Sequence, residues 1–329
     1  MLGDSAYVAA PFDHAKADII LRSSDNLDFR VFKLFLSLAS LYFEKLFDVP
    51  QPTEASKDQE TKDGIAVIRV QENRKTLDTL LRFCYPCTLA EDPKLEVLKD
   101  LVDVLAAARK YSLTTIERKI YQALSNPQIL EAEPLRCFAI ARRGHAHQET
   151  ILAAKYTLTQ PLIPSWFPEI SLISAADLLT LLTYHQRCGD AVYALRSDMS
   201  WIESHYGGSQ GCGWLSGISE SRNCRCVKST TAKYKPFKLP PLKWWEDFMD
   251  ETFIALRDKP CRATVLSFVA KTVESVRKQD CPTCSVGVSE RMRDFSELMT
   301  KKVEDVVSKV RSVTRRWMEY LCSLSIFIL

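Results

Sequence analysis

The chain has 329 residues, enough for roughly two domains, and its 46% hydrophobic and 26% charged residues are typical of a soluble globular protein. Its 44 Lys+Arg and 41 Asp+Glu leave a formal net charge of only +3, which predicts no general attraction to nucleic acid or to a membrane. The N-terminus has no signal-peptide pattern, and the apolar stretch 317–329 is shorter than the ~20 residues that cross a bilayer. We therefore expect a cytoplasmic or nuclear protein that is not secreted.

The first part of the chain predicts two strands and a helix after a disordered segment, 1–14. The β-prone runs 17–21 and 29–31 flank Ser23-Ser24-Asp25-Asn26, a cluster of turn formers, and this pattern predicts a hairpin. Apolar residues then recur every three or four positions, which predicts one helix over 32–47. We expect it to be buried through Phe35, Leu36, Phe43 and Leu46.

The next segments predict a loop, a third strand and more helices. Residues 51–64 are polar and contain Pro and Ser, so they predict a flexible loop. Residues 65–70 alternate as a strand, and 76–85 return to helical spacing. Asp92-Pro93 predicts a helix start, and Thr114 to Glu117 form the pattern of a capping box. Strands gathered before helices indicate an α+β fold.

Several of these segments, taken together, resemble the BTB/POZ domain. The resemblance is carried by Ala17-Asp18-Ile19-Ile20-Leu21, Phe29-Arg30-Val31-Phe32-Lys33, Ser40-Leu41-Tyr42-Phe43, 65–70, Leu80 to Tyr85, and Leu101 to Leu113. It covers about residues 15–125 and implies a protein-interaction fold that dimerises or recruits a partner. The chain also resembles the BTB proteins abundant in mushroom-forming fungi, through 135–162, Trp244-Trp245 and the later Cys-x-x-Cys.

Two positions depart from common BTB patterns. Phe32 stands where many BTB domains have a histidine, which favours a packing role. Asp48-Val49-Pro50-Gln51-Pro52-Thr53 does not supply the hydrophobic-x-Glu motif that adaptors of cullin-type ubiquitin ligases often carry after the preceding helix. A cullin-type partner stays possible, but the motif is absent.

The remainder of the chain predicts a mostly α-helical C-terminal region. We expect a helical extension over 126–206, a Gly/Cys/Lys-rich loop over 207–241, and a helical region over 242–329. The predicted helices are 134–157, 175–205 behind a Ser174/Asp177 capping box, 242–256, 262–278 and 289–321.

Four of the eleven cysteines form two close pairs, Cys224-Arg225-Cys226 and Cys281-Pro282-Thr283-Cys284. Such spacings present two thiolates from one turn, and four soft ligands suit a tetrahedral structural zinc. The alternative is unrelated reduced thiols, because free cysteine is commonly a small buried residue. The first pair is only Cys-x-Cys, more than fifty residues separate the pairs, and Cys212 is a competing ligand. No other cofactor is expected.

Three further patterns have ordinary structural explanations. Gly207-Gly208-Ser209-Gln210-Gly211 matches the G-x-S-x-G of hydrolases, but the strand that should precede such a serine is missing. Trp244-Trp245 predicts one ring packed inward and the other against a neighbouring element. The C-terminal helix has a coiled-coil spacing, which indicates docking on its own domain, self-association or binding of a partner helix; the residues are Met299, Val303, Val306, Val310, Val313, Trp317 and Tyr320.

The sequence therefore predicts a non-enzymatic protein-interaction module, an adaptor or regulator that binds proteins, including a second copy of itself. The alternative is a metal-dependent or hydrolytic enzyme built on the C-terminal half. That alternative needs an open coordination position, and no His or Glu stands at a suitable spacing beside the cysteines.

Overall fold

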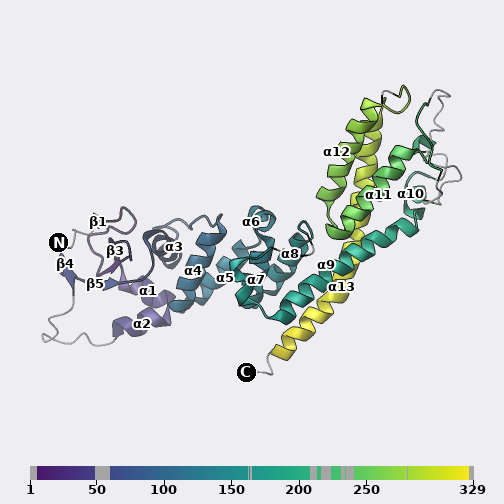
Figure 1. The fold of residues 1–329 in the computed structure, drawn as a ribbon. Coiled ribbons are helices and arrows are strands. Elements are labelled where there is room, and N and C mark those ends of the chain that lie inside the picture. The colour runs from purple at the N-terminus through teal and green to yellow at the C-terminus, as the bar shows by residue number, and fades with distance from the viewer. Residues whose placement is uncertain are drawn as a thin grey trace. The chain divides into compact units, whose positions relative to one another are not determined.

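The computed structural model describes residues 6–48, 60–161, 163, 165–207, 213–215, 224–230, 234, 241–279 and 281–325, with backbone alone beyond residue 310. Its contacts divide the chain into two compact units, Met1–Leu152 and Ala153–Leu329. A mixed sheet with helices forms the N-terminal unit, and the C-terminal unit is largely helical (Figure 1). This confirms the predicted fold class.

The N-terminal unit is built on a five-stranded sheet in the order β1-β3-β2-β5-β4. The predicted hairpin is confirmed, because β2 and β3 pair antiparallel with Ile19 opposite Val31. Strand β5 pairs parallel with β2 and antiparallel with β4, and β1 pairs parallel with β3. The strands are β1 (Ala6–Tyr7), β2 (Ile19–Arg22), β3 (Leu27–Val31), β4 (Thr61–Lys62) and β5 (Ile65–Arg69).

The prediction of a disordered segment over 1–14 is wrong for residues 6–14. Strand β1 joins the sheet, and Phe12 is fully buried. The Phe12 ring lies 5.6 Å from that of Phe29 and 5.2 Å from that of Tyr85, between centroids. An isolated aromatic gives no periodic signal, so this core residue could not be found from the local pattern.

The predicted helix over 32–47 is two helices, α1 (Lys33–Ala39) and α2 (Leu41–Asp48), because Ser40 adopts an extended conformation. The Ser40 hydroxyl donates to the Tyr111 carbonyl and accepts from the main-chain N–H groups of Tyr42 and Phe43, so it caps α2. Of the four predicted core residues, Leu36 and Phe43 are buried, whereas Phe35 and Leu46 are half-buried.

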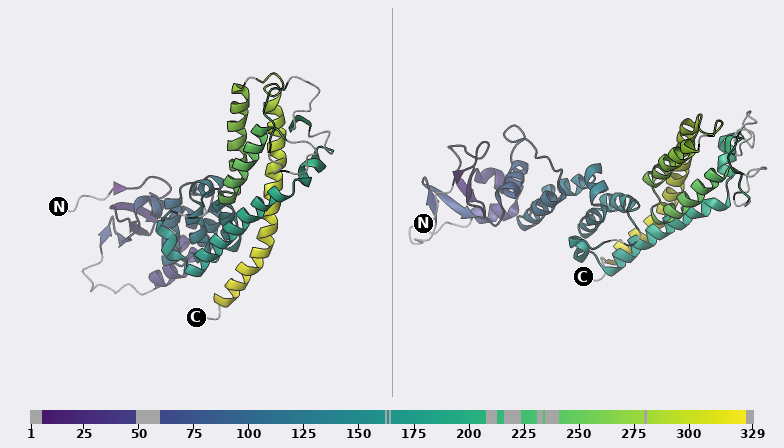
Figure 2. Two further views of the ribbon diagram at one scale, coloured as in Figure 1. Left: turned by 45° about the vertical axis from the view of Figure 1, so that its right-hand side comes forward. Right: turned by 45° about the horizontal axis from the view of Figure 1, so that its top comes forward.

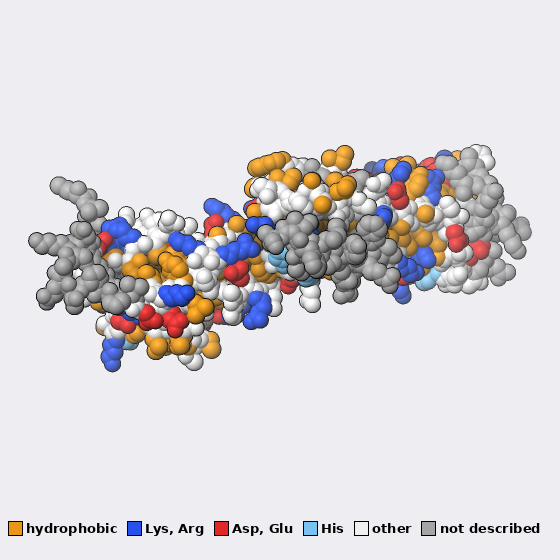
Figure 3. Space-filling view, turned by 90° about the horizontal axis from the view of Figure 1, so that it is seen from below, with side chains coloured by type: hydrophobic (Ala, Val, Ile, Leu, Met, Phe, Trp, Pro, Cys, Tyr) orange, Lys and Arg blue, Asp and Glu red, His pale blue; other side chains and the backbone are white. Residues whose placement is uncertain are grey.

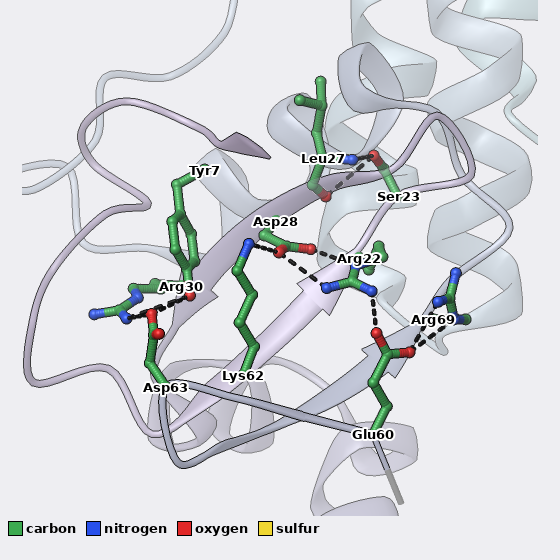
Figure 4. Close-up of polar contacts among 10 residues, drawn as sticks. All are labelled: Tyr7, Arg22, Ser23, Leu27, Asp28, Arg30, Glu60, Lys62, Asp63 and Arg69. Carbon is green, nitrogen blue, oxygen red and sulfur yellow. Dashed lines mark hydrogen bonds and ion pairs between the residues drawn. The ribbon is translucent and has the colours of Figure 1, made fainter. Parts of the chain in front are cut away.

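The predicted loop over 51–64 is wrong at its C-terminal end. Residues 51–59 lie outside the described residues, but Thr61–Lys62 form β4 and turn back into β5 through Asp63 and Gly64, both with positive φ. Asp63 accepts hydrogen bonds from Tyr7 and Arg30, both at 2.6 Å, which ties this turn to the other end of the sheet (Figure 4).

A buried ion-pair network lies beside the same turn. Asp28 on β3 has no exposed side-chain surface and accepts from Arg22 Nε at 2.6 Å and from Lys62 Nζ at 2.7 Å (Figure 4). Arg22 also pairs with Glu60, which in turn accepts from Arg69. The network therefore joins four strands, β2, β3, β4 and β5, together with Glu60, the residue before β4.

The helices of this unit follow the sheet. They are α3 (Arg74–Cys84), α4 (Leu98–Lys110), α5 (Thr114–Ala123), α6 (Pro127–Ala132), α7 (Pro134–Arg143) and α8 (His147–Thr157), which runs past the unit boundary. Three predictions are wrong in detail. The fourth helix begins at Leu98 rather than at Asp92, and α5 has no side-chain cap at its N-terminus. The helix predicted over 134–157 breaks at Gly144-His145, where His145 has a φ of 55°.

Four helices of the C-terminal unit, α9, α11, α12 and α13, pack alongside one another (Figure 2). The Ser174/Asp177 capping box at the start of α9 is confirmed, but the helix predicted over 175–205 stops at Ala194. The elements are η1 (Pro168–Leu172), α9 (Ala175–Ala194), η2 (Leu195–Ser197), α10 (Ser200–His205), η3 (Gly213–Leu215), α11 (Lys243–Asp258), α12 (Arg262–Lys278) and α13 (Val288–Ser325).

An aromatic cluster forms the core of this unit. Phe295 on α13 is fully buried and contacts Trp245 and Phe248 of α11 at centroid distances of 6.1 and 6.0 Å. Trp244, on another face of α11, packs against Trp214 at 6.4 Å. The prediction that one ring of the Trp pair packs inward and the other against a neighbouring element is confirmed.

Helices α9 and α11 approach closely at Gly189. A Cβ atom there would lie 2.1 Å from the carbonyl oxygen of Arg257, so only glycine fits without movement of one helix. One turn earlier, the buried His185 ring makes a 2.8 Å hydrogen bond to the Asp258 carbonyl.

The predicted apolar stripe of α13 is docked on its own unit over its described part. Of the predicted residues, Met299 and Val303 are buried, and Val306 and Val310 are half-buried. Helix α13 packs against both α9 and α12. The side chains of Val313, Trp317 and Tyr320 lie outside the described residues. Among the helices that the structure describes, none is long and apolar enough to span a membrane.

Candidate metal centre and interaction surface

The two cysteine pairs come together in the C-terminal unit. Cys224 and Cys226 lie in a short segment before α11, and Cys281 and Cys284 lie in the turn between α12 and α13. Their four Sγ atoms all lie within 4.8 Å of one another. The Cys224–Cys284 and Cys224–Cys281 sulfur pairs are 3.6 and 3.9 Å apart. These separations are far longer than the ~2.05 Å of a disulfide bond, so the four thiols are free.

Main-chain bonds hold both segments in place. Lys228 forms an antiparallel bridge with Leu242, supported by hydrogen bonds from Ser229 N to the Pro241 carbonyl at 2.8 Å and from Lys243 N to the Val227 carbonyl at 2.9 Å. The other turn is closed by Ser285, whose main-chain N–H donates to the Cys281 carbonyl at 2.9 Å. Each pair of thiols is therefore presented by a short, hydrogen-bonded turn.

The environment differs among the four thiols. Cys281 and Cys284 are buried, and Cys224 and Cys226 are half-buried. Burial raises the pKa of Cys226 to about 11 and, with hydrogen bonds to neighbouring thiols, raises that of Cys284 above its usual range. Burial also opposes ionisation of Cys281, but main-chain N–H groups outweigh it and lower the pKa to about 6; they belong to Arg225, Cys284 and Thr283. N–H groups that donate to a sulfur stabilise the thiolate, the form that binds metals.

The donor set of this cluster consists of cysteine alone. Within the part of the chain that the structure describes, no His, Asp or Glu joins the four sulfurs. The competing ligand considered above, Cys212, lies outside the described residues, as does Ser209 of the G-x-S-x-G pattern. His185 is bound to the Asp258 carbonyl, and His205 lies 4.0 Å from Asp294, so neither is placed beside the cysteines as a fifth group.

A second candidate site is an apolar surface on the N-terminal unit. We define the α1/α2 surface by Leu34, Leu38 and Leu41, whose exposed fractions are 63, 78 and 67%. Leu34 and Leu38 are four residues apart on α1 and so share one face, and Leu41 begins α2, which packs against α1. Figure 3 shows hydrophobic side chains gathered on the side of the unit where α1 and α2 lie in Figure 1.

The periodic pattern of 32–47 placed these leucines on a helix but did not reveal them as a surface. Leu36 and Phe43 are the buried residues of α1 and α2, and they lie on the faces opposite the exposed leucines. A helix with leucine on several faces is consistent either with complete burial or with an exposed apolar face. Only the placement of neighbouring elements distinguishes these two arrangements.

Comparison with known families assigns the N-terminal unit. Residues 11–128 match the BTB/POZ domain, a range slightly wider than the predicted 15–125, so the chain carries a BTB/POZ domain there. Such domains generally serve protein–protein interaction and dimerisation and are typically not catalytic. The chain matches no curated protein.

Proposed function

We propose that this protein is a homodimeric adaptor or regulatory protein in which the BTB/POZ domain joins two copies through the α1/α2 surface. The observation that carries the proposal is the exposure of Leu34, Leu38 and Leu41 on a domain of a class that generally dimerises. Three leucines in contact with water lose the free energy of burial, about 1.5–3 kcal/mol each, and a second copy could recover it. Exposed apolar side chains that cluster on one face of a domain are typical of an interaction site.

A twofold interface fits this patch because each copy would present the same leucines to the other. The helical C-terminal unit would then be displayed twice, so that it positions or recognises a further protein.

A cullin-type ligase is not part of the proposal, since the motif expected after α2 is absent from the sequence. Membership of the expanded BTB proteins of mushroom-forming fungi is supported by residues 135–162, Trp244-Trp245 and Cys281–Cys284. An alignment in which sequences of that group lack these features would argue against this membership.

The test measures the mass of the full chain in solution. Light scattering after size exclusion should give about twice 37.4 kDa for the unchanged protein and 37.4 kDa for Leu34→Asp/Leu38→Asp. Leu179→Asp is the matched control, because Leu179 is 65% exposed on helix α9 and lies outside the BTB domain. It should leave the mass unchanged.

Retained helical circular dichroism in each variant shows that the loss of mass is not unfolding. A monomeric unchanged protein at tens of micromolar, or a double variant that stays dimeric, would overturn the proposal.

A further inference from the structure

We propose that Cys224, Cys226, Cys281 and Cys284 bind one structural Zn²⁺ ion, which fastens the segment before α11 to the turn between α12 and α13. This inference concerns the C-terminal unit and does not depend on dimerisation through the BTB domain. It begins with the sulfur separations. A tetrahedral ion with Zn–S bonds of about 2.3 Å places its ligands roughly 3.8 Å apart. The separations of 3.6 and 3.9 Å lie on either side of that value.

The ligand chemistry favours zinc in a closed site. Four thiolates in tetrahedral array suit zinc or iron, not the hard cations that prefer oxygen. All four sulfurs lie within 4.8 Å, which fits one ion; in a polynuclear iron–sulfur cluster the thiolates bind different irons and stand further apart. Since four protein ligands fill a tetrahedral zinc, no position is left for water or substrate. The role is therefore structural rather than catalytic.

The segment 224–230 shows why a metal would be needed. Val227 is 71% exposed and Ser229 is the one buried residue of this segment, so hydrophobic burial contributes little to holding it. Its order rests on the bridge to Leu242 and on the Ser229 hydroxyl, which donates to Glu246. A bound metal supplies ordering free energy where burial does not.

The location of the ion also matters for the aromatic core. The bridge ends at Leu242, directly before α11, whose first turn carries Trp244 and Trp245. Cys284 lies four residues before the start of α13, which carries Phe295. The ion would thus join the starts of the two helices that contribute this core, at positions that are more than fifty residues apart in sequence.

The experiment uses the full chain, produced with zinc in the medium and purified without a metal-affinity step. Elemental analysis should find about one zinc per chain. Cys281→Ser and Cys226→Ser should each lower the content at least about fivefold, because a lost thiolate breaks the closed site. The matched control is Cys87→Ser, since Cys87 is an exposed cysteine with the same x-x spacing to Cys84 but no place in the cluster. It should keep the full zinc content.

A second measurement does not depend on the folding of a variant. Co²⁺ added to the reduced, metal-free full chain should give the intense visible absorption of a tetrahedral thiolate site, and one equivalent of Zn²⁺ should abolish it. Absence of both bound zinc and this absorption would overturn the proposal, as would an iron spectrum from the purified protein. Loss of zinc in Cys212→Ser with retention in Cys226→Ser would show that the ligand set is wrong.

Discussion

The buried carboxylate of Asp28 offers the sharpest test of how the N-terminal unit is held together. In Asp28→Asn the side chain keeps its shape but loses its charge, which leaves Arg22 and Lys62 without the anion that lies between them. Removal of one partner from a buried ion pair costs about 3–5 kcal/mol. Because Arg22 retains Glu60 and Lys62 is partly exposed, we expect a loss of about 3 kcal/mol, at the lower end of that range.

That loss can be measured by thermal unfolding of the full chain, followed by a probe confined to the N-terminal unit, such as hydrogen exchange of the β2 amides. For a unit of this size 1 kcal/mol corresponds to about 2–4 °C, so the melting temperature should fall by about 6–12 °C. Asp63→Asn is the control, because its side chain is 54% exposed and also accepts from a cation, Arg30; its effect should be much smaller. Equal shifts for the two variants would refute the argument from burial.

Four further predictions concern single features of the fold. Phe43→Ala should destabilise the BTB domain by about 3–5 kcal/mol in chemical denaturation, since the ring is 3% exposed and stacks on Tyr111 at 4.9 Å; an unchanged midpoint would remove Phe43 from the core. Gly189→Ala should cost about 1–3 kcal/mol through the 2.1 Å approach to Arg257, and a gain in stability, as expected for Ala in an isolated helix, would show that α9 and α11 separate easily. Burial lowers the pKa of His185, although the hydrogen bond to the Asp258 carbonyl and the Asp258 charge oppose this shift. The stabilisation is therefore fully present above about pH 6.5, the pKa of an unfolded histidine, and should be lost as the pH falls through the lower pKa of the folded protein. His185→Gln should flatten this pH dependence of stability relative to the unchanged chain. Deletion within 51–59 should change stability by about 1 kcal/mol or less because closure entropy varies slowly with length, and insoluble protein would contradict that expectation.

Local sequence patterns determined much of the secondary structure. The β-prone runs on either side of a turn-forming cluster located the β2/β3 hairpin to within a residue or two. Alternating and helical spacings did the same for strand β5 and for helices α11 and α12. The Ser174/Asp177 capping box could also be predicted from the sequence, because its two residues are only three positions apart. In contrast, the same pattern at Thr114 formed no cap, which shows that a capping sequence permits the bond without enforcing it.

The elements that the sequence missed depend on distant partners. Strands β1 and β4 have two residues each and carry no period; they exist because β3 and β5 offer them an edge. The break at Ser40 is stabilised by the Tyr111 carbonyl, 71 residues away, and the burial of Asp28 by residues of two other strands. No local propensity encodes such contacts.

The cysteines illustrate both sides. Short spacings within each pair made Cys224, Cys226, Cys281 and Cys284 candidate ligands, because a turn can present two thiols to one ion. Cys84 and Cys87 have the same kind of spacing, so spacing alone does not define a site. Whether the two pairs meet is decided by the packing of α11, α12 and α13, which brings the two turns together across a separation of more than fifty residues. The sequence by itself determined which residues could bind a metal, and the tertiary structure alone decided that their sulfurs lie within reach of a single ion, because the distance between remote segments is set by helix packing and not by any local pattern.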